Sequence, residues 1–149
     1  EEAVPMGRPV LRRWAPCNCP PEIARIGPHD EPVNATTSLD VWGFGLCLFE
    51  LLMQGPLFES ELGDHELLAT LVDDKPVVIR GLADMNPVLA TVLQNCLVKD
   101  PEGRWTVDQI LDHLEAAGCI DELGASHKVV PFANFLRPLH TLLQLRETD

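Results

Sequence analysis

The fold of this chain is constrained most by one apolar run, Asp40-Val-Trp-Gly-Phe-Gly-Leu-Cys-Leu-Phe-Glu-Leu-Leu-Met-Gln-Gly55. The run is hydrophobic on every side when it is drawn as a helix, and such a helix has to be buried in a large core or in a membrane. It is shorter than the roughly 20 apolar residues that span a bilayer, and it contains Glu50. We therefore predict that it forms the central buried helix of a soluble domain, with the carboxylate of Asp40 at its mouth.

The bulk composition is that of one globular domain. The 149 residues are 46% hydrophobic and 23% charged, and a chain of this length buries roughly 68–70% of the surface that it exposes when unfolded. The net charge of −12 disfavours nucleic acid and anionic membranes as partners, because both would repel the chain. The sequence also lacks the features of a signal peptide and of a membrane span.

The cysteines and histidines show no spacing that is typical of a metal site or of a disulfide framework. The cysteine count of five is odd, and Cys47 and Cys96 fall within apolar helical patterns, where a free cysteine behaves as a small hydrophobe. The five histidines are likewise scattered. We predict no metal site, reduced thiols and an intracellular, cytoplasmic location.

Periodicity and capping residues predict a mainly α fold, a helical bundle around the central helix. Residues 1–35 carry seven of the thirteen prolines and are expected to be loop, apart from one helical turn that begins at Pro21. The central helix should cover residues 39–54, with Thr37 or Ser38 as its cap and Gly55-Pro56 as its stop. The other predicted helices are residues 64–72 with Asp64 as cap, residues 87–98 with Asn86 as cap, a helix from the capping box of Thr106 and Gln109 to Gly118, and residues 131–146, restarted at Pro138.

Three motifs stand in a fixed order along the chain. Cys19-Pro20-Pro21-Glu22 resembles the A-P-E motif that ends the activation segment of protein kinases. Asp40-Val-Trp42-Gly-Phe-Gly45 resembles the D-x-W-x-x-G helix of the kinase C-lobe, and Asp100-Pro101-Glu-Gly-Arg104-Trp-Thr106 resembles the closing D-P-x-x-R-x-T segment. The resemblance identifies residues 1–117 as part of a protein kinase C-lobe, from a divergent serine/threonine or tyrosine-kinase-like member, and leaves residues 118–149 as a C-terminal helical tail.

The resemblance implies structural roles for five residues. Glu22 and Arg104 are expected to form a buried ion pair that fastens the end of the activation segment to the helices, because arginine binds a carboxylate through two parallel hydrogen bonds. The alternative is two unrelated surface charges. Asp40 is expected to accept backbone hydrogen bonds from the catalytic loop, or else only to stabilise the start of its helix through the dipole. Trp42 and Gly45 complete the central motif.

The catalytic motifs of the family are missing from the sequence. It contains no Gly-rich loop followed by a strand lysine, no H-R-D-x-x-x-x-N loop and no D-F-G, so ATP, Mg²⁺ and the catalytic base are expected only in a longer parent kinase. No residue is predicted to be catalytic or to bind a cofactor. Because Glu22 lies near a first residue that is not Met, we expect a cut-out whose partners are the N-lobe and catalytic loop of its own parent, and which is inactive alone.

The residues before Glu22 are the candidates for contact with a protein or peptide substrate, namely Trp14, Ala15, Pro16 and Cys17. Serine/threonine kinases usually carry G-T-x-x-Y-x-A-P-E there, and Ala15 or Pro16 stands near the position of that threonine. The parent is expected to transfer the γ-phosphate of ATP to a protein hydroxyl, of Ser or Thr rather than Tyr. The missing threonine leaves a pseudokinase scaffold as the alternative, and a free-standing helical interaction module is a third hypothesis.

Overall fold

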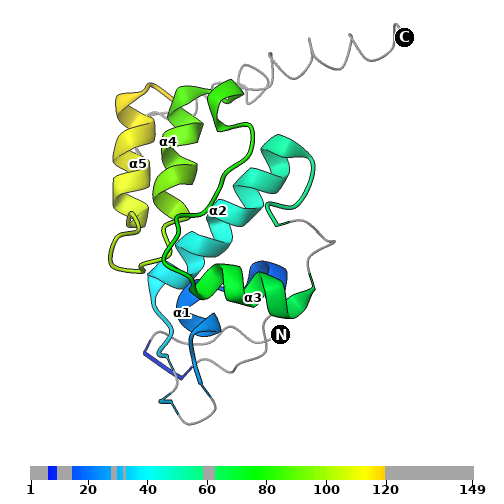
Figure 1. The fold of residues 1–149 in the computed structure, drawn as a ribbon. Coiled ribbons are helices and arrows are strands. Elements are labelled where there is room, and N and C mark those ends of the chain that lie inside the picture. Colours follow the sequence, from blue (N-terminus) through cyan, green and yellow to red (C-terminus); the bar gives the residue numbers. More distant parts are fainter. Residues whose placement is uncertain (1–6, 10–14, 28–29, 32, 59–62, 120–149) are drawn as a thin grey trace, which may run out of the picture. The chain divides into compact units, whose positions relative to one another are not determined.

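The computed structural model describes residues 7–9, 15–27, 30–31, 33–58 and 63–119. These residues form helices η1 (Pro16–Asn18), α1 (Pro21–Ala24), α2 (Thr37–Met53), α3 (Asp64–Val72), η2 (Leu82–Asp84), α4 (Pro87–Cys96) and α5 (Val107–Ala116) (Figure 1). Within the same ranges there is no β-strand, only an isolated bridge between Pro9 and Asn34. The prediction of a mainly α fold is therefore confirmed.

The chain divides into two compact units, Glu1–Ile110 and Leu111–Asp149, so that the division falls inside α5. The predicted boundary between residues 117 and 118 stays a prediction. The helix expected over residues 131–146 lies outside the described residues. In the part of the chain that the structure describes, the helices are all too short or too polar to cross a membrane.

Helix α2 forms the centre of the first unit and packs against α4 (Figure 1). Its buried side chains recur at the spacing of one helical face: Leu39, Val41, Trp42, Leu46, Phe49 and Leu52. Burial of the helix is confined to this face, because Phe44, Cys47 and Leu51 are exposed on the opposite stripe. Among the described residues no element covers that stripe, and the thiol of Cys47 is exposed on it.

The two ends of α2 differ from the sequence prediction. Its N-cap is Thr36 rather than Thr37 or Ser38, and no side chain bonds the free backbone N–H groups of the first turn. The reason is that the hydroxyls of Thr36 and Ser38 bond each other, at 2.8 Å. At the other end the helix stops at Met53, one residue before the predicted end, and Gln54 is its left-handed C-cap, with φ of 53°.

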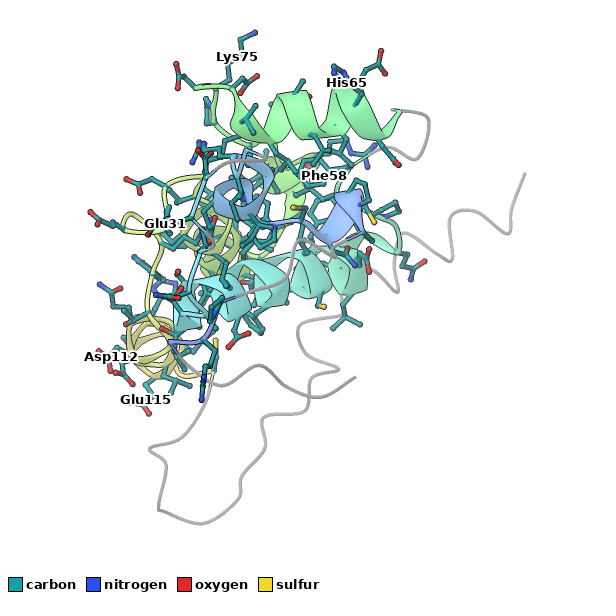
Figure 2. All side chains as sticks on the ribbon, turned by 90° about the horizontal axis from the view of Figure 1, so that it is seen from below. Glu31, Phe58, His65, Lys75, Asp112 and Glu115 are labelled. Atoms are coloured by element: carbon teal, nitrogen blue, oxygen red, sulfur yellow. The ribbon has the colours of Figure 1, made fainter. Side chains whose placement is uncertain are left out.

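Helix α1 begins at Pro21, as predicted, and lies beside α3 (Figure 1). Helix α3 has the predicted bounds, but its first residue is not its cap. Gly63 occupies the cap position, where its N–H donates to the carboxylate of Glu66 at 3.3 Å. The side chains of His65, in the first turn of α3, and of Lys75, which follows the helix, are exposed and point away from the ribbon (Figure 2).

The signals that start α4 and α5 are confirmed, and α4 ends two residues before the predicted residue 98. The Oδ1 of Asn86 accepts the N–H of Val88 at 2.9 Å, so Asn86 caps α4, which ends at Cys96. Thr106 and Gln109 form the capping box of α5, since each side-chain oxygen accepts the other's backbone N–H, at 3.3 and 2.8 Å. After α5, Gly118 adopts the left-handed conformation, with φ of 67°.

Candidate functional site

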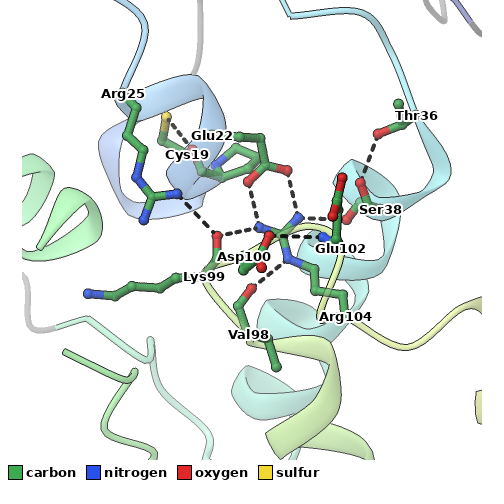
Figure 3. Close-up of polar contacts among 11 residues, drawn as sticks. Cys19, Glu22, Arg25, Thr36, Ser38, Val98, Lys99, Asp100, Glu102 and Arg104 are labelled. Carbon is green, nitrogen blue, oxygen red and sulfur yellow. Dashed lines mark hydrogen bonds and ion pairs between the residues drawn. The ribbon is translucent and has the colours of Figure 1, made fainter. Parts of the chain in front are cut away.

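An ion pair between Glu22 and Arg104 joins two segments that lie far apart in the sequence. Glu22 belongs to α1, and Arg104 belongs to the connection between α4 and α5, here called the 97–106 loop. The Nη1 of Arg104 lies 2.6 Å from Oε1 of Glu22, and its Nη2 lies 2.5 Å from Oε2, so the two groups meet as a fork (Figure 3). Arg104 is only 5% exposed. The predicted pair is therefore present, buried and bidentate.

The remaining donors of Arg104 are also used. Its Nε–H donates to the carbonyl of Val98 at 2.7 Å, within the 97–106 loop, and its Nη1 donates to the carbonyl of Ser38 at 2.9 Å (Figure 3). A buried charge is costly unless every polar group finds a partner. Arg104 meets that condition and thereby connects α1, the first turn of α2 and its own loop. The two carbonyl acceptors carry no side-chain signal, so the sequence did not reveal them.

Trp42 lies beneath the same guanidinium. The Cζ of Arg104 is 5.0 Å from the centroid of the Trp42 ring, a cation–π distance, and the tryptophan is completely buried. The aromatic ring thus supplies the face on which the fork of Arg104 rests, and it ties the ion pair to the core of α2.

Gly45 lets α2 and α4 approach each other closely. A Cβ atom at this position would lie 2.9 Å from the Cβ of Cys96 and 2.9 Å from a methyl carbon of Leu97. Such distances are shorter than any normal contact, so only glycine fits. In contrast, a Cβ at Gly43, in the same helix, would meet nothing within 4 Å.

Asp40 is exposed in the first turn of α2. Among the described residues it makes no hydrogen bond and no ion pair. Phe44, Cys47 and Leu51 follow it on the same face of the helix, at steps of three and four residues, and Phe44 and Leu51 are 45% and 56% exposed. Asp40 therefore heads an uncovered apolar stripe, and we call the three residues behind it the α2 stripe.

The candidate substrate contacts form a short turn in front of α1. Helix η1 is held by the bonds from Asn18 N–H to the carbonyl of Ala15, at 2.9 Å, and from Cys19 N–H to the carbonyl of Pro16, at 3.2 Å. Ala15 and Cys17 are exposed and Pro16 is partly exposed. Trp14, the fourth candidate, lies outside the described residues.

Lys99 is a residue that the sequence analysis missed. Its Nζ donates to three acceptors at the end of α3: the carbonyl of Thr70 at 2.5 Å, the carbonyl of Asp73 at 3.3 Å and the carboxylate of Asp73 at 2.6 Å. The bond from Lys99 to this carboxylate, and next the bond from the backbone N–H of Lys75, hold the pKa of Asp73 below its ordinary value. No sequence signal pairs a lysine with a carboxylate 26 residues away.

The described ranges contain no group of three or more His, Cys, Asp or Glu side chains that could hold a metal ion. The five cysteines are free thiols, of which Cys17 and Cys47 are exposed and Cys96 is buried. Burial raises the pKa of the Cys96 thiol to about 12, so this group stays protonated and inert.

Comparison with known proteins agrees with the geometry. The family model described as "Protein tyrosine and serine/threonine kinase" matches residues 13–114. The chain is 35% identical over 75 residues, half of its length, to mitogen-activated protein kinase kinase 3 of Arabidopsis thaliana. It is 30% identical over 100 residues, 66% of its length, to the probable serine/threonine-protein kinase mkcD of Dictyostelium discoideum.

A further similarity is to mitogen-activated protein kinase kinase kinase 4 of Mus musculus, at 31% identity over 84 residues, or 56% of the chain. The matched segment spans only 14% of the Arabidopsis protein, 14% of the Dictyostelium protein and 5% of the mouse protein. The chain thus corresponds to a small portion of each of these relatives.

Proposed function

The chain belongs to the protein tyrosine and serine/threonine kinase family, and we propose that it is the substrate-facing part of a C-lobe whose parent transfers the γ-phosphate of ATP to Ser or Thr hydroxyls of proteins. The observation that carries this proposal is the bidentate bond between Glu22 and Arg104. This bond holds α1 in place, and the exposed turn η1 lies directly before α1 in the chain.

In this proposal a protein or peptide substrate binds along Trp14, Ala15, Pro16 and Cys17. A substrate segment has to be held in one geometry relative to the transferred phosphoryl group, because kinases catalyse mainly by positioning and electrostatic stabilisation. A short exposed turn becomes a defined docking edge only if its base is rigid. The buried fork of Arg104 behind Glu22 provides that rigidity.

We propose that Asp40 and the α2 stripe face the catalytic loop of the parent. Asp40 has acceptor oxygens without a partner among the described residues, so it is free to bind backbone N–H groups of a loop. The exposed surfaces of Phe44 and Leu51 supply apolar area that such a neighbour would cover. An anchoring carboxylate next to an uncovered apolar face fits a docking surface better than a solvent-facing helix.

ATP and Mg²⁺ are proposed to bind outside the described residues, which offer no ligand set for a metal ion. The role of this portion is then to bind substrate and to support the loop that performs the chemistry. The parent is also proposed to work inside the cell, where ATP is present. The free, exposed thiols of Cys17 and Cys47 support this proposal, because thiols stay reduced there.

The test is phosphoryl transfer from γ-labelled ATP by the longest natural protein that contains this chain, with peptides that present either Ser/Thr or Tyr as the acceptor. We expect label on Ser/Thr peptides, and a large loss of that label with Arg104→Lys, because lysine cannot form the fork. The matched control is Glu31→Gln, at an exposed position that is not part of the Glu22–Arg104 ion pair. Labelling of Tyr alone would overturn the assignment of acceptor.

A pseudokinase scaffold is the second candidate, and one observation favours it. The residues of the η1 turn, Ala15, Pro16 and Cys17, carry no hydroxyl where serine/threonine kinases carry a threonine. A folded full-length protein that transfers no phosphate to any acceptor, yet binds a partner through this C-lobe, would favour the scaffold over the kinase.

A further inference from the structure

The 97–106 loop holds two separate helices through two cations. Arg104 binds α1 through Glu22, and Lys99, five residues earlier, binds the end of α3. The carbonyl of Lys99 also accepts weak bonds from Arg25, which follows α1, and from Arg104, both at 3.5 Å (Figure 3). One loop therefore reaches both elements that border η1.

Lys99 caps the C-terminal end of α3 from the 97–106 loop, which lies far from α3 in the sequence. The last carbonyls of a helix have no partner within the helix, and a cation is favourable there because of the helix dipole. The ammonium has three donors, and it binds the Thr70 carbonyl and both the carbonyl and the carboxylate of Asp73. The side chain of Lys99 is only 10% exposed, while that of Asp73 is 38% exposed, so the contact is shielded on the lysine side.

Helix α3 supports the candidate substrate turn from behind. It packs against both η1 and α1. Leu67 and Leu71 of α3 share one core with Cys19, which directly follows η1, and with Ile23 of α1. A helix of nine residues is too short to be stable by itself, since isolated helices below about 12–15 residues are marginal in water. The position of α3 therefore depends on its packing and on its caps.

We propose that Lys99 is a positioning residue for substrate binding: by holding the end of α3, it keeps α3 packed beneath η1 and keeps that turn in its binding geometry. The inference rests on the proposed function of η1 as a substrate contact. Lys99 does not touch the substrate, and its effect reaches the turn through the Leu67 and Leu71 side of α3. Loss of Lys99 should weaken peptide binding and leave the chemical step unaffected.

The first test is steady-state kinetics on the longest natural protein that contains this chain. Lys99→Met keeps the apolar stem but removes the charge and the donors, and it should raise the KM for peptide substrate about tenfold, the effect of losing one charge-assisted contact. We expect kcat and the KM for ATP to stay unchanged. Lys99→Arg should restore the peptide KM, because the guanidinium reaches the same acceptors with its charge.

The matched control is Lys75→Met, which removes an exposed lysine close to the same helix end and should leave every constant unchanged (Figure 2). An equal rise in the two KM values, a fall in kcat, or no change in the peptide KM would each overturn the proposal. A failure of Lys99→Arg to rescue would overturn it as well.

The second test does not need catalysis. Amide hydrogen exchange of the same variants reports on Asn18 and Cys19, whose N–H groups close η1, and on the last turn of α3. Lys99→Met should speed exchange at both places and leave α2 unchanged. If the parent transfers no phosphate, the proposed function fails, and this experiment still decides the inference: faster exchange confined to α3, or spread evenly over the unit, would refute the link from Lys99 to η1.

Discussion

Arg104 lies over the ring of Trp42, with 5.0 Å between its guanidinium carbon and the ring centroid, while the same guanidinium grips the carboxylate of Glu22. Arg104 thus connects the 97–106 loop to Trp42 in the core of α2 and to Glu22 in α1. The planar guanidinium contacts the face of the Trp42 ring and, at its edge, bonds the carboxylate of Glu22. Removal of Glu22 therefore leaves a buried guanidinium without its carboxylate partner.

The first prediction concerns the ion pair. Glu22→Ala should lower the free energy of unfolding by about 3–5 kcal/mol, because the buried charge of Arg104 is left without its partner. The measurement is the urea midpoint followed by circular dichroism. The control is Glu31→Ala, at an exposed position, which should change stability by less than about 0.5 kcal/mol. Equal midpoints for the two variants would contradict a buried, energetically important pair.

The second prediction compares two glycines of α2. Gly45→Ala should destabilise the chain by about 1–3 kcal/mol, because the added methyl group collides with Cys96 and Leu97. Gly43→Ala should instead stabilise it by roughly 0.5–1 kcal/mol, since there is free space around that position and alanine favours the helix. Opposite signs in thermal unfolding are the expected result. The same sign for both would refute the close approach of α2 and α4.

The third prediction is a pH dependence at the end of α3. The pKa of Asp73 is lowered below its ordinary value of 3.8, chiefly by its hydrogen bond from Lys99. The carboxylate therefore contributes stability that is present above its unfolded-state pKa and is lost as the pH falls through the lower folded-state pKa. Asp73→Asn should be less stable than the natural chain at neutral pH, and the gap should close in strong acid.

The measurement for Asp73 is the urea midpoint of the two proteins from about pH 7 down to about pH 2. Lys99→Met serves as the companion variant, because without the ammonium the Asp73→Asn change should matter little. A stability gap that stays constant across this range would contradict the assigned role of the carboxylate.

The fourth prediction concerns the α2 stripe. The 149-residue chain should bind a hydrophobic dye, since Phe44 and Leu51 are about half exposed on one face. The double variant Phe44→Ser, Leu51→Ser should bind much less dye. Val78→Ser is the control, because Val78 is 80% exposed at a site away from the stripe. A sharp, reversible and dye-free unfolding transition of the natural chain would contradict an uncovered apolar surface.

The fifth prediction uses the cysteines as reporters. Iodoacetamide should alkylate Cys17 and Cys47 in the native chain, whereas Cys96 should react only after unfolding, because its thiol is buried and its pKa is raised to about 12. Peptide mass spectrometry identifies the alkylated positions. In the longer parent protein, Cys47 should become protected if another segment covers the α2 stripe. Rapid native alkylation of Cys96 would show that α4 is not packed on α2.

Much of the fold was predictable because its signals are local. Pro21, Asn86 and the capping box of Thr106 and Gln109 each act within one helical turn, so the starts of α1, α4 and α5 follow from neighbouring residues. The cap of α2 was predicted wrongly, because the hydroxyls of Thr36 and Ser38 bond each other instead of the backbone. Two equivalent local bonds compete at such a position, and the sequence does not rank them.

By itself the sequence determined the helical character of the described residues, because periodicity and capping are local, and the resemblance of its motifs to those of protein kinases predicted the pairing of Glu22 with Arg104. Only the tertiary structure decided which surfaces are covered and which distant groups meet. The exposure of Cys47 and the hydrogen bonds of Lys99 to the end of α3 both depend on how segments that are distant in the sequence pack in the folded chain. Burial and long-range hydrogen bonds arise from packing, and packing has no local signature.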